Sequence, residues 1–489
     1  MRPSLSDLIE EARLSARALL DYGEHLFSPT IRLGVTGLSR AGKTVFITAL
    51  IHGLTRGGRF PVFEAFATGR IARARLEPQP DDAVPRFDYE NHVRTLIQDR
   101  IWPHSTIDIS ELRLVIDYQR QNGADRSLTL DIVDYPGEWL LDLPLLHKSY
   151  EQWSRESLAL SRASARASLA APWHAYLATL RAEGHADEQA ARTAARLFTD
   201  YLRACRDERF AMSLLPPGRF LMPGNLQGSP ALTFAPLDLP AQGEVPDGSL
   251  WAMMRRRYEA YKDFIVRPFF RDHFARLDRQ VVLIDALSAF NSGPEALIDL
   301  EAALSGILDC FRIGRSTLFS ALFRPKIDRI LFAATKADHL HHSSHDRLEA
   351  VLRRAVARAV AKAEDTGAAI DVVALAAVRA TREAQVARGR ERLPSILGTP
   401  AAGESAGGAA FDGNTEVATF PGDLPENPED MFKGEAAFRG LSSASAEKAD
   451  FRFLRFRPPR LEHEGTDEPA LPHIRLDRAL QFLIGDKLQ

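Results

Sequence analysis

The feature that most constrains this chain is an uninterrupted match to G-x-x-x-x-G-K-[ST] from Gly37 to Thr44. An apolar run, IRLGVTG, leads into it and predicts a short buried strand, and the run from Val45 to Leu54 predicts the helix that follows. In this order, the glycines let backbone N–H groups converge on phosphate oxygens, and the helix adds the positive end of its dipole. The chain is therefore expected to bind a nucleotide.

The residue types within this loop fit a nucleotide held with Mg²⁺. Lys43 is expected to reach the β and γ phosphates, and the Thr44 hydroxyl is a ligand for Mg²⁺. The residues of the loop expected to contact the nucleotide are Gly37, Ser39, Arg40, Ala41, Gly42, Lys43, Thr44 and Val45.

A second motif follows a predicted β-hairpin whose turn contains Asn122-Gly123. The segment LTLDIVDYPGEW places Asp134 at the end of an apolar strand and Gly137 three residues later, which matches D-x-x-G. We expect Asp134 to hold Mg²⁺ through water and the backbone N–H of Gly137 to sense the γ phosphate. Asp285, at the end of VVLID, is the competing acid, and otherwise it caps the next helix.

A third motif, Thr335-Lys336-Ala337-Asp338, ends another predicted strand and matches [NT]-K-x-D. Guanine presents two adjacent donors, N1–H and the 2-amino group, and the Asp338 carboxylate can accept both. Adenine lacks that amino group, so Asp338 selects against ATP. The stem of Lys336 is expected to pack over the base, and Thr335 replaces the commoner Asn.

Two further segments complete the predicted site. The strand AIDVVALAAV ends where a backbone N–H would recognise the guanine O6, and the candidates there are Ala376, Ala377 and Val378. In WPHSTIDIS, Thr106 precedes a β run and is expected to close on Mg²⁺ when a γ phosphate is present, with Ser105 as the alternative ligand.

Catalysis is expected from Lys43, Thr106 and Glu138. Small GTPases carry Gln directly after D-x-x-G, whereas this chain has Glu138, and a carboxylate near the γ phosphate is unfavourable unless it acts as a base or turns away. Positive charge at the transition state could come from Arg40 or Arg100. This departure predicts slow hydrolysis.

The pattern of elements predicts an α/β fold, a P-loop NTPase with a mostly parallel sheet. Strands are expected at 111–118, 127–135, 280–287, 327–335 and 369–378, and helical patterns lie between the later ones. Residues from about 395 to 430 are rich in Gly, Pro and Ala and predict a loop. FRFLRFRPP predicts a β element, and IRLDRALQFLIGDKL an amphipathic helix.

Composition limits the class of protein. A formal net charge of −3 over 489 residues gives no electrostatic reason to expect nucleic acid as a partner. The two cysteines, Cys205 and Cys310, lack metal or redox spacing and fit a reducing compartment. No apolar run approaches the ~18 residues that span a bilayer, so we expect a cytoplasmic protein without a transmembrane segment.

These segments together resemble the YcjX-like bacterial stress proteins, which are Ras-like GTP-binding proteins with large insertions. The matching segments are GLSRAGKT, IWPHST, ISELRL, LDIVDYPGEWLLDLPLL, QVVLIDALSAFNSGP, TKADHL, FPGDLP, FRFLRFRPP and LPHIRLDRALQFLIGDKL. The resemblance implies a cytoplasmic GTPase associated with envelope-stress responses, acting near the inner membrane with a membrane-bound partner.

The chain is accordingly divided into six predicted parts. They are an N-terminal amphipathic helix (1–30), the first part of a Ras-like GTPase domain (31–138), a large helical insertion (139–279), the second part of that domain (280–390), a Gly/Pro-rich insertion (391–450), and a C-terminal β element and helix packing on the GTPase domain (451–489).

The sequence thus predicts a GTP- and Mg²⁺-binding switch. Two alternatives stay open: an ATP-dependent P-loop enzyme, in which the Thr-Lys-Ala-Asp match is a coincidence, and a scaffold that nucleotide stabilises without turnover.

Overall fold

The chain is described here from a computed structural model. It covers residues 29–38, 40–104, 106–240, 244–310, 327–364, 368–388, 391–406, 409–433, 453–461 and 469–489. The expected N-terminal amphipathic helix, Ser39 and Ser105 lie outside the described residues, apart from the last two positions of the 1–30 segment.

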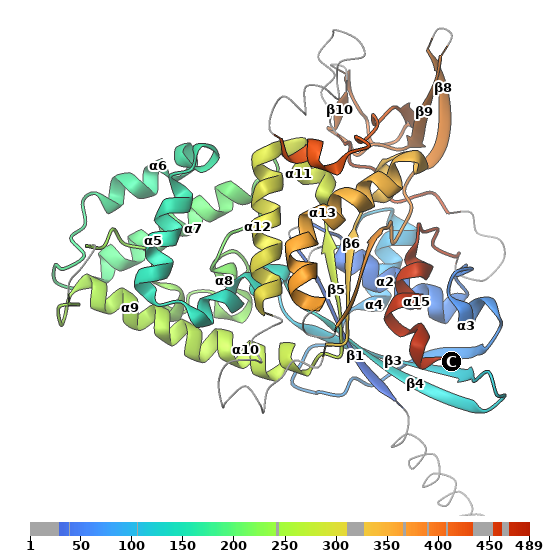
Figure 1. Cartoon of the computed structure of the whole chain (residues 1–489), viewed down its shortest axis with the longest axis horizontal. Coiled ribbons are helices and arrows are strands. Elements are labelled where there is room, and N and C mark those ends of the chain that lie inside the picture. The colour runs from blue at the N-terminus through green and yellow to red at the C-terminus, as the bar shows by residue number, and fades with distance from the viewer. Residues whose placement is uncertain are drawn as a thin grey trace, which may run out of the picture.

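A seven-stranded sheet forms the centre of the molecule (Figure 1). Its order is β2 (Ile71–Glu77), β3 (Ser110–Gln119), β4 (Asp125–Asp134), β1 (Thr30–Gly37), β5 (Arg279–Ile284), β6 (Arg329–Ala334) and β7 (Ala369–Ala374). The pairs from β4 to β7 are parallel, whereas β2, β3 and β4 pair antiparallel. A mixed α/β fold with a mostly parallel central sheet is confirmed, and it is consistent with a P-loop NTPase.

The parallel register brings the predicted motifs to one edge of this sheet. Val35 pairs with Asp134, and Ala334 pairs with both Ile284 and Ala374. The loops that leave the carboxyl ends of β1, β4, β6 and β7 therefore meet, which is where open α/β sheets bind their ligands.

Helices cover both faces of the sheet, because successive residues of a strand point to opposite sides. On β5, Val282 packs in one core with Leu304 of α12, and Leu283 packs in the other core with Ile47 of α2. The helices over the first face are α11 (Ala286–Ser292), α12 (Pro294–Cys310) and α13 (His345–Glu364). Those over the second are α2 (Lys43–Arg56), α4 (Tyr89–Arg94), which continues into η1 (Thr95–Asp99), and α15 (Leu476–Ile484), followed by η11 (Gly485–Lys487). The short α3 (Glu64–Ala67) lies beside them.

A helical lobe stands beside the sheet and is formed by the chain between β4 and β5 (Figure 1). Its elements are η2 (Gly137–His147), α5 (Tyr150–Ser161), α6 (Ser164–Leu177), α7 (Glu188–Arg206), α8 (Gly218–Leu221), η3 (Gly224–Leu226), η4 (Pro230–Leu232), α9 (Leu250–Tyr261), η5 (Lys262–Val266), α10 (Arg267–Asp272) and η6 (Phe274–Arg276). Aromatic rings fill its core, and those of Trp153 and Tyr258 stack 5.1 Å apart. The lobe and the α12 face of the sheet share one continuous core. Whether the lobe is an insertion into a Ras-like domain stays a prediction.

The region between β7 and the final helix departs from the sequence prediction. The expected loop at about 395–430 contains strands, because the end of β9 (Glu391–Gly398) and all of β12 (Val417–Thr419) lie within it. Together with β8 (Arg382–Arg388), which precedes it, they form a small antiparallel sheet. The pair β10 (Ser405–Ala406) and β11 (Ala409–Ala410) is a further short ribbon, and η10 (Pro428–Phe432) follows. FRFLRFRPP, expected to be a strand, shows one isolated bridge, Pro400 to Phe456, over its described residues.

Two other expectations concern the ends of the fold. The edge strand β2 was not predicted, since its sequence, IARARLE, lies in a stretch that looks merely polar. The C-terminal amphipathic helix is confirmed as α15, which buries Leu480 and Leu483 against the sheet. Among the described residues, no helix has the length and apolar character needed to cross a bilayer.

Candidate functional site

A cavity of about 580 Å³ lies at the carboxyl edge of the sheet, and the predicted motifs line it. The predicted site residues on its wall are Gly37, Arg40, Ala41, Gly42, Lys43, Thr44, Val45, Thr106, Glu138, Thr335, Lys336, Asp338, Ala376, Ala377 and Val378. Asp134 and Gly137 lie directly behind this wall, where they contact its residues. Segments that are far apart in the sequence therefore converge on one space.

The phosphate loop owes its shape to two residues with positive φ. Gly42 has φ 80° and caps α2, and Arg40 has φ 62°. A Cβ at Gly42 would have open space around it, so the backbone conformation rather than crowding favours glycine there. The helix that begins at Lys43 has Gly42 and not a capping side chain at its start, which leaves its first N–H groups directed toward the cavity.

Four polar side chains gather at the base of this loop. Thr106 Oγ1 donates to Asp134 Oδ2 over 2.5 Å and lies 3.4 Å from Thr44 Oγ1. Lys43 Nζ lies 3.8 Å from Asp134 Oδ1. The structure therefore brings together the residues predicted to bind Mg²⁺ and the lysine predicted to bind phosphate.

The electrostatics of Asp134 fit a cation at this point. The carboxylate is 1% exposed, and Oδ1 has no hydrogen-bond partner among the described residues. Burial raises the pKa of Asp134, and the charge of Lys43 and the hydroxyl of Thr106 offset only part of that effect. Two hydroxyls and a buried carboxylate with a spare oxygen form an oxygen donor set of the kind that Mg²⁺ prefers.

Gly137 lies against the beginning of the phosphate loop. A Cβ at this position would come within 2.1 Å of the Gly37 carbonyl oxygen, so only glycine permits this approach. The next residue is equally close to the helical lobe, because a Cβ on Gly218 would come within 1.8 Å of the Glu138 carbonyl oxygen. Gly137 and Glu138 thus lie in close contact with the phosphate loop on one side and with the helical lobe on the other.

Glu138 lies in the cavity wall beside Arg206, an arginine that was not predicted from the sequence. Its carboxylate forms an ion pair of 2.9 Å with Arg206, which comes from α7 of the lobe and also lines the cavity. Arg206 is one of several arginines in an Ala/Arg-rich helix, and spacing alone does not distinguish it from Arg203. Glu138 is buried here, and its carboxylate faces Arg206. This pairing offsets the electrostatic repulsion expected between the carboxylate and a γ phosphate.

The two arginines considered from the sequence lie differently. Arg40 pairs with Glu208 over 2.6 Å at the cavity rim. Arg100 donates to the Pro458 carbonyl through Nε and Nη2 and is not on the cavity wall. The expectation that Arg100 could supply transition-state charge therefore has no support in this geometry.

Asp338 occupies the opposite end of the cavity. Its Oδ2 accepts from the Ala380 N–H over 2.7 Å, and its backbone carbonyl accepts from the Thr381 hydroxyl. These bonds fix a buried carboxylate that still lines the cavity. Each carboxylate oxygen has two lone pairs, so this arrangement leaves acceptor capacity for a ligand.

Lys336 has φ 61° and forms an ion pair of 2.5 Å with Asp285. Asp285 also accepts from the Ser288 N–H and caps α11, so its predicted role as a helix cap is confirmed. Because Asp285 pairs with the lysine of the third motif, it supports the end of the cavity that Lys336 and Asp338 line.

The Ala376 N–H, one of the amides expected to recognise the guanine base, already has a hydrogen-bond partner. The Ala376 N–H donates to the Ile474 carbonyl over 3.1 Å, and the Ile474 N–H donates back. A strand-like bridge to the segment before α15 therefore occupies the Ala376 amide in this structure, and its role in recognising the base stays a prediction. Ala377 and Val378 remain the candidates at the strand end.

The C-terminal segment also contributes residues that were not predicted. Arg455 and Phe456 line the cavity, and the Phe456 carbonyl accepts from the Trp102 indole N–H over 2.6 Å. The Phe456 ring lies edge-on to His339, next to Asp338. Only the aromatic and basic character of FRFLRFR signalled this segment, since nothing local specifies which loop it covers.

Comparison with known proteins gives a consistent result along the chain. Residues 31–488 match the YcjX-like family, DUF463. A protein of Escherichia coli (strain K12) named Ras-like GTPase YcjX is 37% identical over 475 residues, which cover 94% of this chain and 96% of that relative. A protein of the same name from Shewanella oneidensis (strain MR-1) is 34% identical over 489 residues, which cover 94% of this chain and 95% of the relative. The similarity thus includes the sheet, the lobe and the C-terminal segment.

Proposed function

The chain belongs to the YcjX-like family, and we propose that it binds GTP with Mg²⁺ and hydrolyses it slowly as a nucleotide-dependent switch. The observation that carries this proposal is that Lys43 and Asp338 line the same cavity, one suited to phosphate and the other to guanine. The names of the two relatives, both Ras-like GTPases, support the same assignment.

At the phosphate end, each polar residue has a distinct task. The backbone N–H groups from Gly42 to Thr44 and the Lys43 ammonium bind the phosphate oxygens. Thr44, Thr106 and, through water, Asp134 would hold Mg²⁺, which when bound neutralises charge on the phosphates. Thr106 already lies against Asp134, so the loop that carries it needs little movement to close the site.

The hydrolysis step needs positive charge where the transition state gains negative charge. We assign this task to Arg206, which Glu138 holds at the cavity wall. Glu138 then acts as a positioning residue and not as the base that activates water. The proposal keeps the expectation of slow turnover, because this geometry offers no neutral side chain like glutamine next to Gly137 to orient water.

The base specificity is tested by competition for a bound fluorescent GDP analogue. GDP should displace it at least about a hundredfold better than ADP, because adenine leaves the buried Asp338 acceptors without their donors. Equal displacement by ADP would favour the ATP-dependent alternative.

A complementary substitution sharpens this test. Asp338→Asn exchanges one acceptor for a donor, so the variant should lose affinity for GDP and gain affinity for xanthosine diphosphate, which carries an oxygen in place of the 2-amino group. An unchanged affinity for GDP in the folded variant would show that the carboxylate does not face the base.

The turnover rate tests the enzymatic part. With saturating GTP and Mg²⁺, we expect steady-state phosphate release well below ~1 s⁻¹, the lower end of the range typical of kinases. Turnover within that range would contradict the account.

The variant Lys43→Ala distinguishes the proposed switch from a scaffold that nucleotide stabilises without turnover. A switch should lose nucleotide binding and keep its fold, because the Lys43 ammonium lies near Asp134 at the cavity and does not belong to either core. A scaffold that nucleotide stabilises should instead lose thermal stability together with binding.

The cellular setting is proposed on the family resemblance. We propose that the switch acts in an envelope-stress response, as a cytoplasmic protein that reaches the inner membrane through a membrane-bound partner. Fractionation of cells before and after heat shock tests this, and a chain that stays in the soluble fraction under both conditions would contradict the peripheral location.

A further inference from the structure

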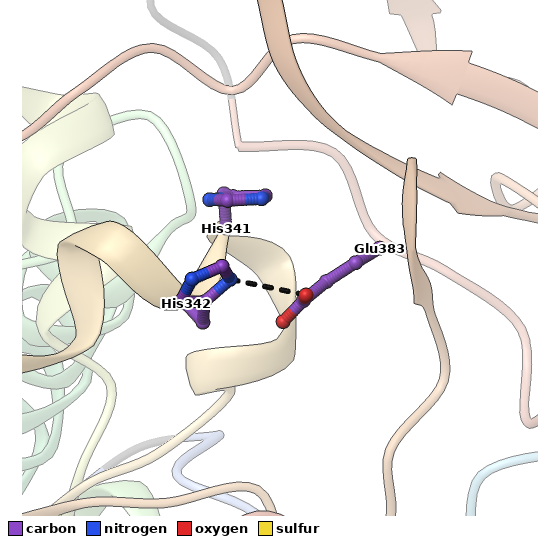
Figure 2. A group of neighbouring side chains, drawn as sticks. All are labelled: His341, His342 and Glu383. Atoms are coloured by element: carbon purple, nitrogen blue, oxygen red, sulfur yellow. Dashed lines mark ion pairs between the residues drawn. The ribbon is translucent and has the colours of Figure 1, made fainter. Parts of the chain in front are cut away.

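Two histidines and a glutamate, His341, His342 and Glu383, form a cluster of neighbouring side chains (Figure 2). His341 and His342 stand at the start of the short helix η9 (His342–Ser344), and Glu383 faces them from β8. One potential ligand atom from each residue lies within 4.8 Å of the others. The cluster could not be predicted from sequence spacing, because α13 and β7 separate its carboxylate from the histidines along the chain.

The chemistry of the cluster suits a transition metal. Two imidazoles and one carboxylate are ligands that Zn²⁺, Ni²⁺ and Cu²⁺ bind well, whereas Mg²⁺ and Ca²⁺ prefer oxygen alone. His342 Nδ1 lies 3.0 Å from Glu383 Oε2, which is close to the roughly 3.3 Å between neighbouring ligand atoms in a tetrahedral zinc site with bonds of ~2.0–2.1 Å. His342 and Glu383 are exposed and His341 is half-buried, so small rotations of these side chains can close the remaining gap.

The surroundings support a bound cation rather than oppose it. His341 Nδ1 lies 2.9 Å from Ser343 Oγ, and an outer partner of this kind fixes the orientation of a ligating imidazole. Arg379 lies 3.8 Å from Oε1 of Glu383, whereas His342 lies at the other carboxylate oxygen, Oε2. Arg382, the other basic residue on this strand end, is paired with Glu416.

The position of the cluster connects it to the proposed guanine pocket. His341 follows Asp338 by three residues, and Glu383 follows by two residues the segment in which Ala380 and Thr381 hold Asp338. A metal bound by all three residues would therefore join the two loops that position the base-recognising carboxylate.

We propose that His341, His342 and Glu383 bind a divalent transition metal ion, with Zn²⁺ the best fit, and that the bound ion slows release of guanine nucleotide. The second half of this inference rests on the proposed function, and the first half does not. Water would complete the coordination, because the open side of the cluster faces solvent.

Metal binding is measured first, without nucleotide. Untagged full-length protein is titrated with Zn²⁺ alone against a chromophoric indicator. The wild type should bind one ion. His342→Ala and Glu383→Gln should each lower the affinity for Zn²⁺ by on the order of tenfold or more. His185→Ala, a change at an exposed histidine of the lobe, should leave the affinity unchanged. Equal Zn²⁺ affinity in wild type and both cluster variants would overturn the site.

Nucleotide release is measured second. Zn²⁺ should slow the dissociation of a fluorescent GDP analogue severalfold in the wild type and leave Glu383→Gln unaffected. A dissociation rate that Zn²⁺ does not change in the wild type would overturn the coupling. Failure to bind the GDP analogue with or without Zn²⁺, while Zn²⁺ itself still binds, would count against the proposed function and leave the metal site standing.

Discussion

The placement of single residues in the cavity depends on their local motif for some and on packing with distant segments for others. Lys43, Thr44 and Gly42 belong to one contiguous motif, so their placement could be predicted from sequence spacing. Arg206 could not, because it lies on a helix where several arginines share similar spacing, and only the packing of the lobe decides which one reaches the cavity. The same reason explains why the bridge that occupies the Ala376 amide was not predicted, since the Ile474 carbonyl comes from nearly a hundred residues away.

Removing Arg206 should slow hydrolysis more than it weakens binding. We expect Arg206→Ala to reduce kcat for GTP by on the order of a hundredfold, because one donor at a developing charge typically contributes that much. The Kd for GDP should change little, since GDP lacks the γ phosphate. Arg206→Lys should recover part of the rate. Arg203→Ala, an exposed change on the same helix, is the matched control, and an unaltered kcat in Arg206→Ala would contradict the assigned role.

At the scale of elements, long periodic segments could be predicted and irregular ones could not. The hairpin β3–β4, the helix α2 and α15 match their expected positions, because alternation or helical spacing marks each of them. The strands β8, β9 and β12 were missed, since β8 (REAQVAR) is mostly polar, β9 (ERLPSILG) contains a proline, and β12 has only three residues. Contacts between elements, such as those of η2 with α8, were also beyond prediction.

The contact between Glu138 and Gly218 should tolerate no side chain. Gly218→Ala would place a Cβ within 1.8 Å of the Glu138 carbonyl, so we expect a loss of about 1–3 kcal/mol in the free energy of unfolding. Gly306→Ala is the matched control inside α12, where a Cβ would meet only Pro144 at 3.9 Å and the helix should gain stability. Thermal melting of both variants decides the matter, and equal melting temperatures would argue against this tight docking.

Asp142 should make the stability of the lobe depend on pH. It accepts from Tyr261 Oη and from the Gly218 N–H, and burial raises its pKa from 3.8 to about 6. The folded state therefore binds the proton more tightly than the unfolded state, so the contribution of Asp142 is fully present below pH 3.8 and is lost as the pH rises through about 6. The difference corresponds to roughly 3 kcal/mol.

Urea unfolding of the wild type and Asp142→Asn between pH 4 and 7 tests this. The stability advantage of the wild type over the variant should shrink as the pH rises. Asp200→Asn, at an exposed site on α7, should show no such trend. A difference between wild type and Asp142→Asn that stays constant with pH would contradict the raised pKa.

At the scale of the whole molecule, the phosphate loop and the helical lobe approach each other through Gly137 and Glu138. Gly137 lies against Gly37, and Glu138 lies against both Gly218 and Arg206. Any shift of the Gly137 backbone toward a γ phosphate therefore has to move the first turn of the lobe or break these contacts.

Hydrogen exchange should report that movement. We expect protection across residues 139–175 to differ between the GDP-bound protein and the protein bound to a non-hydrolysable GTP analogue. Exchange in β5 and β6 should stay the same, because the sheet is rigid and common to both states. Identical protection across residues 139–175 would remove the idea that the lobe reads the nucleotide state.

The central claim is that one cavity binds the phosphates at Lys43 and the guanine at Asp338. The most direct measurement is the identity of the nucleotide that is released when the natively purified, untagged chain is denatured and its supernatant is chromatographed. The account predicts guanine nucleotide, chiefly GDP, and its absence from Lys43→Ala purified in the same way. Adenine nucleotide released from the wild type would contradict it.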